Sequence, residues 1–267
     1  GIFFKILGFV YLTFLLIVLG DWGNTTDKLG DGRKHTALVQ LTGVIKPTGE
    51  ASAEKITEAL QAAFKDHGTQ GVILRINSPG GSPVQAGYIN DEILRLRAKY
   101  PDIPLYAVIE DICASGGYYV AAAADRIYAD KASMVGSIGV RMDSFGFTGL
   151  MEKLGVERRL LTAGQNKGLL DPFLPVDEKQ KEHVVAMIGD IHEQFISVVK
   201  EGRGKRLKET PEIFSGLIWT GAKSLELGLA DAIGTLDLVA RDVIKAEDIV
   251  DYTQKENVAE KLASREN

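Results

Sequence analysis

The sequence predicts an α/β protein built on a parallel sheet, because apolar runs of strand length alternate with stretches of helical character. The strand runs are residues 37–41, 71–76 and 105–109, and the helical stretches between them are residues 54–65 and 84–99. This alternation is typical of βαβ units, in which a helix connects two parallel strands. A long apolar stretch near the N-terminus predicts one more helix, outside the sheet.

Residues 1–20 are expected to form a transmembrane signal anchor. The apolar run over residues 6–19 is interrupted only by one glycine and one threonine, and its length approaches the roughly 20 residues that span a bilayer. No small-x-small cleavage site follows, and Trp22 stands where an interfacial aromatic anchor is expected. An uncleaved anchor is therefore favoured over a cleaved signal peptide. Because the sequence begins at Gly1, we expect cytoplasmic residues to precede it.

Three further regions follow the anchor. Residues 21–34 are rich in Gly, Asp, Asn, Thr and Lys, which is typical of a flexible juxtamembrane linker. One globular domain is expected over residues 35–254, and residues 255–267 form a charged tail.

The composition excludes several classes of function. A net charge of −5 over 267 residues, without a long basic stripe, gives no reason to expect nucleic-acid binding. The single cysteine excludes an internal disulfide and the common multi-cysteine metal sites, and the four histidines form no His-x-x-x-His pair. We expect neither a metal nor an organic cofactor.

The first βαβ unit ends in two candidate catalytic turns. Ser52 is a candidate N-cap for the helix that ends near Lys65. The strand over residues 71–76 then ends in the turn Asn77-Ser78-Pro79-Gly80-Gly81, whose glycines can present an N–H group to an acyl oxygen. The next strand leads to Ser115. Both turns therefore lie at the carboxyl ends of neighbouring strands, where open α/β sheets bind ligands.

Ser115 is the candidate nucleophile. It follows the apolar strand over residues 105–109 and precedes a small-residue segment, residues 118–124, that suits a buried helix. Unpaired N–H groups and the positive dipole end at a helix N-terminus would stabilise an oxyanion formed there. Gly116 and Gly117 leave room for a substrate carbonyl. Cys113 is an alternative thiol nucleophile, but a small buried thiol is its simpler interpretation.

A hydroxyl nucleophile needs a base, and neither histidine nor lysine is excluded by the residues alone. His35 and His67 precede the core turns in polar settings, while His183 and His192 lie on a helical stretch, so none is a convincing partner. A neutral lysine amine can accept the serine proton when burial lowers its pKa. Lys167, in a loop with glycines, leucines and a proline, has the least surface-like setting of the lysines.

The sequence of the second half predicts six more strands and helices. The Gly136-Ser137-Ile138-Gly139 run, taken by itself, indicates a glycine-rich turn. The elements are strands at residues 126–129, 156–161 and 216–221, and helices at residues 149–154, from an Asp177 cap to about Glu201, and at residues 222–227. Apolar residues recur on one face of the long helix and predict core or subunit contact rather than a substrate groove. They are Val184, Met187, Ile188, Ile191 and Phe195.

The motifs together resemble the short form of signal peptide peptidase A. They are Asn77 to Gly81, Ala114 to Tyr119, Gly136 to Val140, and Lys167 with Pro172 and Phe173; they fall in the family's order within residues 34–249. The resemblance implies a Clp/crotonase-like fold, a ββα superhelix, and a Ser-Lys serine peptidase anchored in a bacterial membrane. Cys113 departs from the small or apolar residue expected there, without affecting the catalytic positions.

The resemblance also assigns site residues. It implies that Ser115 is the nucleophile, Lys167 the general base and Ser137 a second serine that orients the lysine amine. Gly81 and Gly116 match the oxyanion-hole positions.

The function that the resemblance implies is an endopeptidase that degrades cleaved signal peptides and other membrane-associated peptides. It implies a single-pass protein of the cytoplasmic membrane whose catalytic domain lies on the extracytoplasmic side. It also implies a homo-oligomeric ring, in which Ser115 and Lys167 can come from adjacent subunits.

Three alternatives differ in function. An acyl-CoA enzyme of the crotonase fold would use the same paired turns, but no carboxylate pair is placed for enolate chemistry. A Clp-type Ser-His-Asp peptidase would need a histidine within a few dozen residues after Ser115, and none occurs there. A catalytically idle membrane scaffold would not depend on Ser115 at all.

Overall fold

The structure is a computed structural model that describes residues 11–12 and 32–254. Nearly all of the predicted anchor, most of the linker and the tail from residue 255 lie outside the described residues. Within the part of the chain that is described, no helix combines the length and the hydropathy that a bilayer span requires.

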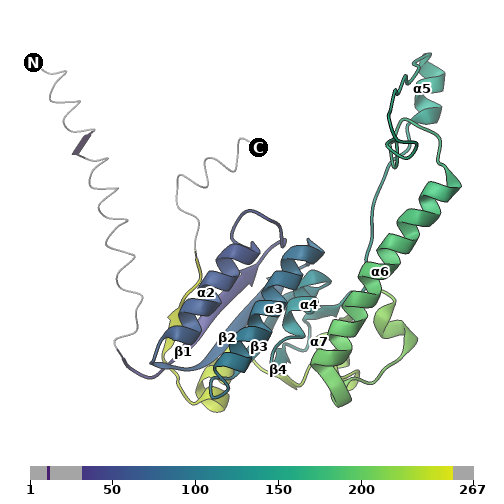
Figure 1. The fold of residues 1–267 in the computed structure, drawn as a ribbon. Helices are drawn as coiled ribbons and strands as arrows, with labels where there is room; N and C mark the ends of the chain where they lie inside the picture. The colour runs from purple at the N-terminus through teal and green to yellow at the C-terminus, as the bar shows by residue number, and fades with distance from the viewer. Residues whose placement is uncertain (1–10, 13–31, 255–267) are drawn as a thin grey trace, which may run out of the picture.

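The described residues form one mixed sheet with helices on both faces (Figure 1), which confirms the predicted α/β class. Its strands are β1 His35–Thr42, β2 Thr69–Ser78, β3 Leu105–Ala114, β4 Arg126–Ala129, β5 Met134–Gly136, β6 Ile218–Thr220, β7 Ala232–Ile233 and β8 Ile249–Asp251. The strand order is β6-β5-β3-β2-β1-β8, and β4 pairs with β3 and β7. Among these pairs only β5 and β6 run antiparallel.

β3 organises the sheet because it pairs with β2 along one edge and with two different strands along the other. Residues 106–109 of β3 pair with β4, while residues 112–114 pair with β5. The strand therefore continues five residues beyond the predicted end at Ile109, and its last residue directly precedes Ser115. The prediction was based on the apolar run, which ends at the polar residues Glu110 and Asp111, and it therefore did not include this continuation.

Three helices cover one face of the sheet and enclose the main core (Figure 1). They are α2 Ala53–Lys65, α3 Pro83–Lys99 and α4 Gly116–Ala121. The predicted N-cap of α2 is confirmed, because the Ser52 side chain accepts a hydrogen bond from the Lys55 N–H. The short helix α4 begins two residues before the predicted small-residue segment, so that its first turn lies directly behind Ser115.

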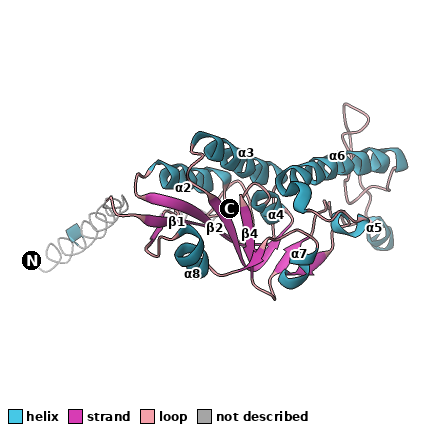
Figure 2. Ribbon diagram, turned by 90° about the horizontal axis from the view of Figure 1, so that it is seen from below, coloured by secondary structure: helices cyan, strands magenta, loops and turns pink. Residues whose placement is uncertain are grey.

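A smaller apolar cluster covers the opposite face near β1. There α8 Leu236–Leu238 and the π-helix η3 Val239–Ile244 pack on alternate side chains of the central strands (Figure 2). Burying a large aliphatic side chain stabilises the fold by roughly 1.5–3 kcal/mol. Both faces of the sheet are therefore anchored, and the carboxyl ends of β2 and β3 are held in fixed register.

Residues 141–183 form an arm that leaves the sheet and ends beyond the far end of α6 (Figure 1). The arm contains α5 Thr148–Leu154, and the long helix α6 Glu178–Arg203 connects it back to the body. The Asp177 side chain caps α6 by accepting from the Gln180 N–H, as predicted. No residue of the arm is buried.

The strand predicted over residues 156–161 is wrong, because this segment pairs with no strand and all six residues are exposed. A strand requires a neighbour for its N–H and C=O groups, and the arm runs away from the sheet edge. The other elements of the second half form near their predicted positions. They are β4, α5, α6, β6 and α7 Gly221–Glu226.

The base of α6 is fixed to the sheet by a buried ion pair. The Arg203 side chain is 1 % exposed, and its two terminal nitrogens donate to the Asp231 carboxylate at 2.9 and 2.8 Å. Burial alone would raise the pKa of Asp231, but hydrogen bonds from Arg203 and the Ile127 N–H and the nearby arginine charges lower it below its ordinary value. The carboxylate therefore holds the last turn of α6 against β4.

Substituting Asp231→Asn should lower the free energy of unfolding by about 3–5 kcal/mol at neutral pH, because Arg203 would remain buried without a countercharge. Since the folded pKa of Asp231 is lowered, its stabilisation is present above the usual carboxyl pKa of about 3.9 and is lost as the pH falls below it. The difference between wild type and variant, measured by urea unfolding, should therefore shrink in acid. Asp242→Asn, which removes one half of an exposed pair with Arg241, is the matched control. Equal losses of unfolding free energy in the two variants would contradict the conclusion that burial makes the Arg203–Asp231 pair important.

Candidate active site

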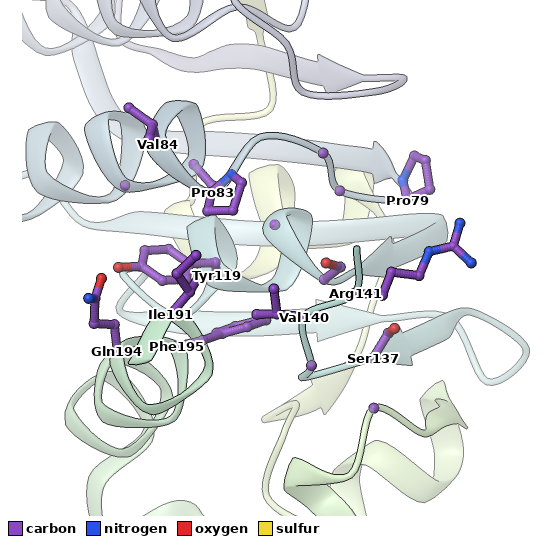
Figure 3. A pocket seen from close by; sticks show the side chains of 18 of the residues that line it. Pro79, Pro83, Val84, Tyr119, Ser137, Val140, Arg141, Ile191, Gln194 and Phe195 are labelled. Carbon is purple, nitrogen blue, oxygen red and sulfur yellow. The ribbon is translucent and has the colours of Figure 1, made fainter. Parts of the chain in front are cut away.

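A cleft of about 1140 Å³ opens at the carboxyl ends of β2 and β3 (Figure 3). The turn after β2, the first turns of α3 and α4, the loop after β5 and one face of α6 line it. Four of the five predicted site residues meet here: Ser115, Gly81, Gly116 and Ser137. The position is the one expected for ligands in an open α/β sheet.

Ser115 occupies a strained junction between β3 and α4. Its φ of 51° is positive, which is uncommon for a residue other than glycine and costs of the order of 1–3 kcal/mol. The surroundings enforce this conformation, because the Ser115 N–H donates to the Gly136 carbonyl at 2.8 Å and its own carbonyl accepts from the Tyr119 N–H at 3.0 Å. The junction turns the chain abruptly and places Ser115 at the wall of the cleft.

The turn after β2 lies against the first residue of α4. A Cβ atom added to Gly80 would lie 2.6 Å from the Gly116 nitrogen, and one added to Gly116 would lie 3.3 Å from the Gly81 nitrogen. Gly80 also has a φ of +94°, a conformation that favours glycine. The glycines therefore permit a backbone approach that brings two N–H groups beside Ser115.

A third segment holds the turn from outside. The Ile45 N–H donates to the Gly80 carbonyl at 2.9 Å, and the Ser82 N–H donates to the Ile45 carbonyl at 2.8 Å. These two bonds form a parallel β-bridge between Ile45 and Gly81, and neither of them uses the Gly81 N–H. A Cβ atom at Gly81 would overlap the Ile45 carbonyl. The Gly81 N–H, together with that of Gly116 at the unpaired start of α4, can therefore serve an oxyanion.

Ser137 lies across the cleft from the turn after β2 (Figure 3). Its φ is 52°, and its N–H donates to the Leu217 carbonyl at 2.8 Å in the loop before β6. The glycine-rich run therefore does more than turn the chain, because it brings a hydroxyl into the same cleft as Ser115.

One side of the cleft is apolar. Val84 and Tyr88 from α3, Tyr119 from α4, and Ile191 and Phe195 from α6 line it. The rings of Tyr119 and Phe195 pack with their centroids 5.2 Å apart. Part of the apolar stripe of α6 therefore lines the candidate site, which corrects the prediction that this stripe would not contribute to a substrate groove.

Lys167 does not reach this cleft within one chain. Its side chain is exposed, and its backbone N–H donates to the Gly164 carbonyl in the arm. The cleft lining does not include it, and the loop beside α5 lies far from α4 in Figure 1. A single chain thus brings together the candidate nucleophile and the candidate oxyanion donors, but not the predicted base.

The alternative nucleophile and bases do not fit this geometry. Cys113 is fully buried, and burial raises the pKa of its thiol. His35 is buried at the start of β1, and His192 bonds to the Ile138 carbonyl. His67 and His183 are exposed, and the cleft lining includes no histidine.

The cleft lining contains one acidic and one basic side chain, Asp91 and Arg141. Asp91 is the one carboxylate in its lining, so the carboxylate pair expected of enolate chemistry does not form there. Among residues 32–254 no group of three potential metal ligands converges.

The sequence prediction missed the residues that support the site. Ser78 belongs to the motif from Asn77 to Gly81, yet its buried contacts depend on Gly43 and Gly117, which are far from it in sequence. Ile45, in the segment after β1, forms its bridge with Gly81, which is also far from it in sequence. Neither role has a local sequence signal, since both arise from segments that meet only when the sheet forms.

Comparison with known proteins gives the family. Residues 97–249 match the profile of Peptidase family S49. An Enterococcus faecium protein provisionally named as a signal peptide peptidase SppA is 30% identical over 239 residues, which are 86% of this chain and 69% of that protein. The chloroplastic serine protease SPPA of Arabidopsis thaliana is 30% identical over 224 residues, which are 78% of this chain and 32% of that protein.

A third relative has a different name. The Na(+)/H(+) antiporter NhaA of Brucella melitensis biotype 1 is 44% identical over 204 residues, covering 76% of this chain. The chain spans only 27% of that protein's length. The profile match and the relatives together show that the chain belongs to Peptidase family S49, among its SppA-type members.

Substituting Gly80→Ala should reduce peptidase activity at least a hundredfold, because the new methyl group would push the turn away from the Gly116 nitrogen and misplace an oxyanion donor. Initial rates on a fluorogenic peptide measure the effect. Gly189→Ala is the control, since Gly189 does not line the cleft, a Cβ there meets nothing within 4 Å and alanine favours helix α6 by about 1 kcal/mol. Comparable activity of the two variants would show that the close approach at Gly80 is unimportant.

Proposed function

We propose that this chain is a serine endopeptidase in which Ser115 is the nucleophile and Lys167 of an adjacent copy is the general base. The observation that carries the proposal is the strained Ser115 junction with the Gly81 and Gly116 N–H groups beside it. Such donors stabilise the tetrahedral intermediate of acyl transfer. Membership of Peptidase family S49 supports the same chemistry.

The reaction begins when the Ser115 Oγ bonds to the substrate carbonyl carbon as its proton passes to the neutral Lys167 Nζ. The carbonyl oxygen becomes an oxyanion that accepts from Gly81 and Gly116, and each donor is worth about 3 kcal/mol. The intermediate collapses as the C–N bond breaks, and the lysine ammonium protonates the leaving amine. Water then hydrolyses the acyl-enzyme, transferring a proton to Lys167 and returning the hydrogen of Ser115.

The shape of the chain supports a dyad shared between subunits. The arm that contains Lys167 buries none of its residues, yet it exposes large apolar side chains such as Phe145, at 76%, and Leu161, at 96%. Apolar surface of this extent is typical of a protein interface. A head-to-tail ring would place the arm of one copy over the cleft of the next.

Ser137 is proposed to orient the lysine amine. Its hydroxyl lies in the same cleft as Ser115, and a hydroxyl oxygen can accept one hydrogen from the incoming lysine amine. One fixed acceptor would leave the lone pair of the neutral amine directed towards Ser115.

The proposed substrates are cleaved signal peptides and other membrane-associated peptides. The apolar wall formed by α3, α4 and α6 supports this choice, since it suits apolar side chains. We further propose that residues 1–20 anchor the protein in the bacterial cytoplasmic membrane as a single span, with the catalytic domain on the extracytoplasmic side. The apolar sequence of those residues supports this part of the proposal.

Ser115→Ala and Lys167→Ala should each reduce kcat on a fluorogenic peptide at least a thousandfold in the full-length chain, because each removes one half of the dyad. Lys179→Ala, an exposed lysine at the start of α6, should leave the rate unchanged. Melting temperature should be unaffected by all three. Activity in Lys167→Ala equal to that of Lys179→Ala would refute the assignment of the base, and an inactive wild type would favour the scaffold alternative.

A further inference from the structure

Ser78, the last residue of β2, has a buried hydroxyl that joins two backbone segments. The residue is fully buried, and its Oγ donates to the Gly43 carbonyl at 2.7 Å. The same oxygen accepts from the Gly80 N–H at 3.1 Å. The hydroxyl donates its one hydrogen to the Gly43 carbonyl, so a lone pair of the Ser78 oxygen remains to accept from the Gly80 N–H.

These two bonds belong to a set of hydrogen bonds that fixes the turn after β2, which contains Gly80 and Gly81. Gly43 follows β1, and its own N–H donates to the Asn77 carbonyl at 2.9 Å. Two residues later, Ile45 forms the bridge that holds the Gly80 carbonyl and the Ser82 N–H. Ser78 therefore fixes the start of a turn whose end is already held from the same neighbouring segment.

Ser78 also packs directly behind the helix that follows Ser115. A Cβ atom added to Gly117 would lie 2.9 Å from the Ser78 carbonyl oxygen and 3.6 Å from its Oγ. In the sheet, Ser78 is paired with Cys113, two residues before the nucleophile. The Ser78 side chain thus bonds to the turn on one side of the candidate oxyanion hole, while the Ser78 backbone carbonyl lies close to Gly117 on the other side.

We infer that Ser78 is a positioning residue that sets the distance between the Gly81 N–H and the Gly116 N–H. The inference rests on the proposed peptidase function, and it assigns Ser78 no contact with substrate. Its hydroxyl holds Gly80 against the α4 terminus, so that both donors point at the same oxygen. Because catalytic rates are sensitive to displacements of about 1 Å, loosening this bond should act on the transition state rather than on substrate binding.

The test compares kinetics and inhibitor binding in Ser78→Ala of the full-length chain. We expect kcat on a fluorogenic peptide to fall about ten- to hundredfold while KM stays within about twofold, because the donors matter only once the oxyanion forms. The affinity for a peptide aldehyde, whose adduct with Ser115 places an oxygen in the hole, should fall by the same factor as kcat/KM. Ser78→Thr, which keeps the hydroxyl, should restore most of the activity.

Ser133→Ala is the matched control for loss of a buried hydroxyl. Ser133 is 2% exposed, and its Oγ accepts from the Asp130 N–H at 3.0 Å and donates to the Glu110 carbonyl. These bonds do not involve the turn after β2. The melting temperature should fall by a similar amount in the two alanine variants. Only Ser78→Ala should show a lower kcat and a weaker affinity for the aldehyde.

The inference is overturned if kcat of Ser78→Ala lies within twofold of wild type. It is also overturned if Ser133→Ala loses the same kcat, or if aldehyde affinity is retained while kcat falls. Should Ser78→Ala fail to fold, Ser78→Cys replaces it, with the same criteria, because the thiol fills the site but bonds weakly. An inactive wild type would instead refute the proposed function.

Discussion

The site depends on the close approach of two backbones, the turn after β2 and the first turn of α4. Parallel pairing of β2 with β3 places the two turns side by side, but only glycine at position 80 allows the first turn to contact Gly116, and only glycine at position 81 avoids the Ile45 carbonyl. The positive φ of Ser115 is the cost of this arrangement, and the buried sheet with its two apolar clusters maintains it. The geometry of the oxyanion donors is thus a property of the whole sheet.

The molecule divides into a rigid body and an arm with different physical character. The body buries its apolar side chains and fixes the candidate nucleophile, the candidate oxyanion donors and Ser137. The arm exposes its apolar side chains and contains Lys167, while the Arg203–Asp231 pair fixes the root of α6 to the sheet. In the proposed assembly the neighbouring copy would cover these apolar side chains, and completion of the proposed active site would depend on association of subunits.

Much of this could be predicted from the sequence because the signals are local. Alternating apolar runs indicated β1 to β3, the caps at Ser52 and Asp177 indicated α2 and α6, and glycine motifs indicated the two turns. What could not be predicted depends on distant partners. The polar continuation of β3 is a strand because β5 pairs with it, residues 156–161 are not a strand because nothing pairs with them, and Ser78 and Ile45 gain their roles from tertiary contacts. The roles of Ser115, Lys167, Ser137, Gly81 and Gly116 remain predictions.

The most direct test of the shared dyad is to mix Ser115→Ala chains with Lys167→Ala chains under conditions that allow subunit exchange, and to measure peptide hydrolysis across mixing ratios. If the nucleophile and the base come from adjacent copies, an equal mixture should recover about a quarter of wild-type activity, since random neighbours pair an intact serine with an intact lysine at that frequency. If both residues act within one chain, no ratio will exceed the activity of either parent, and that result would contradict the account.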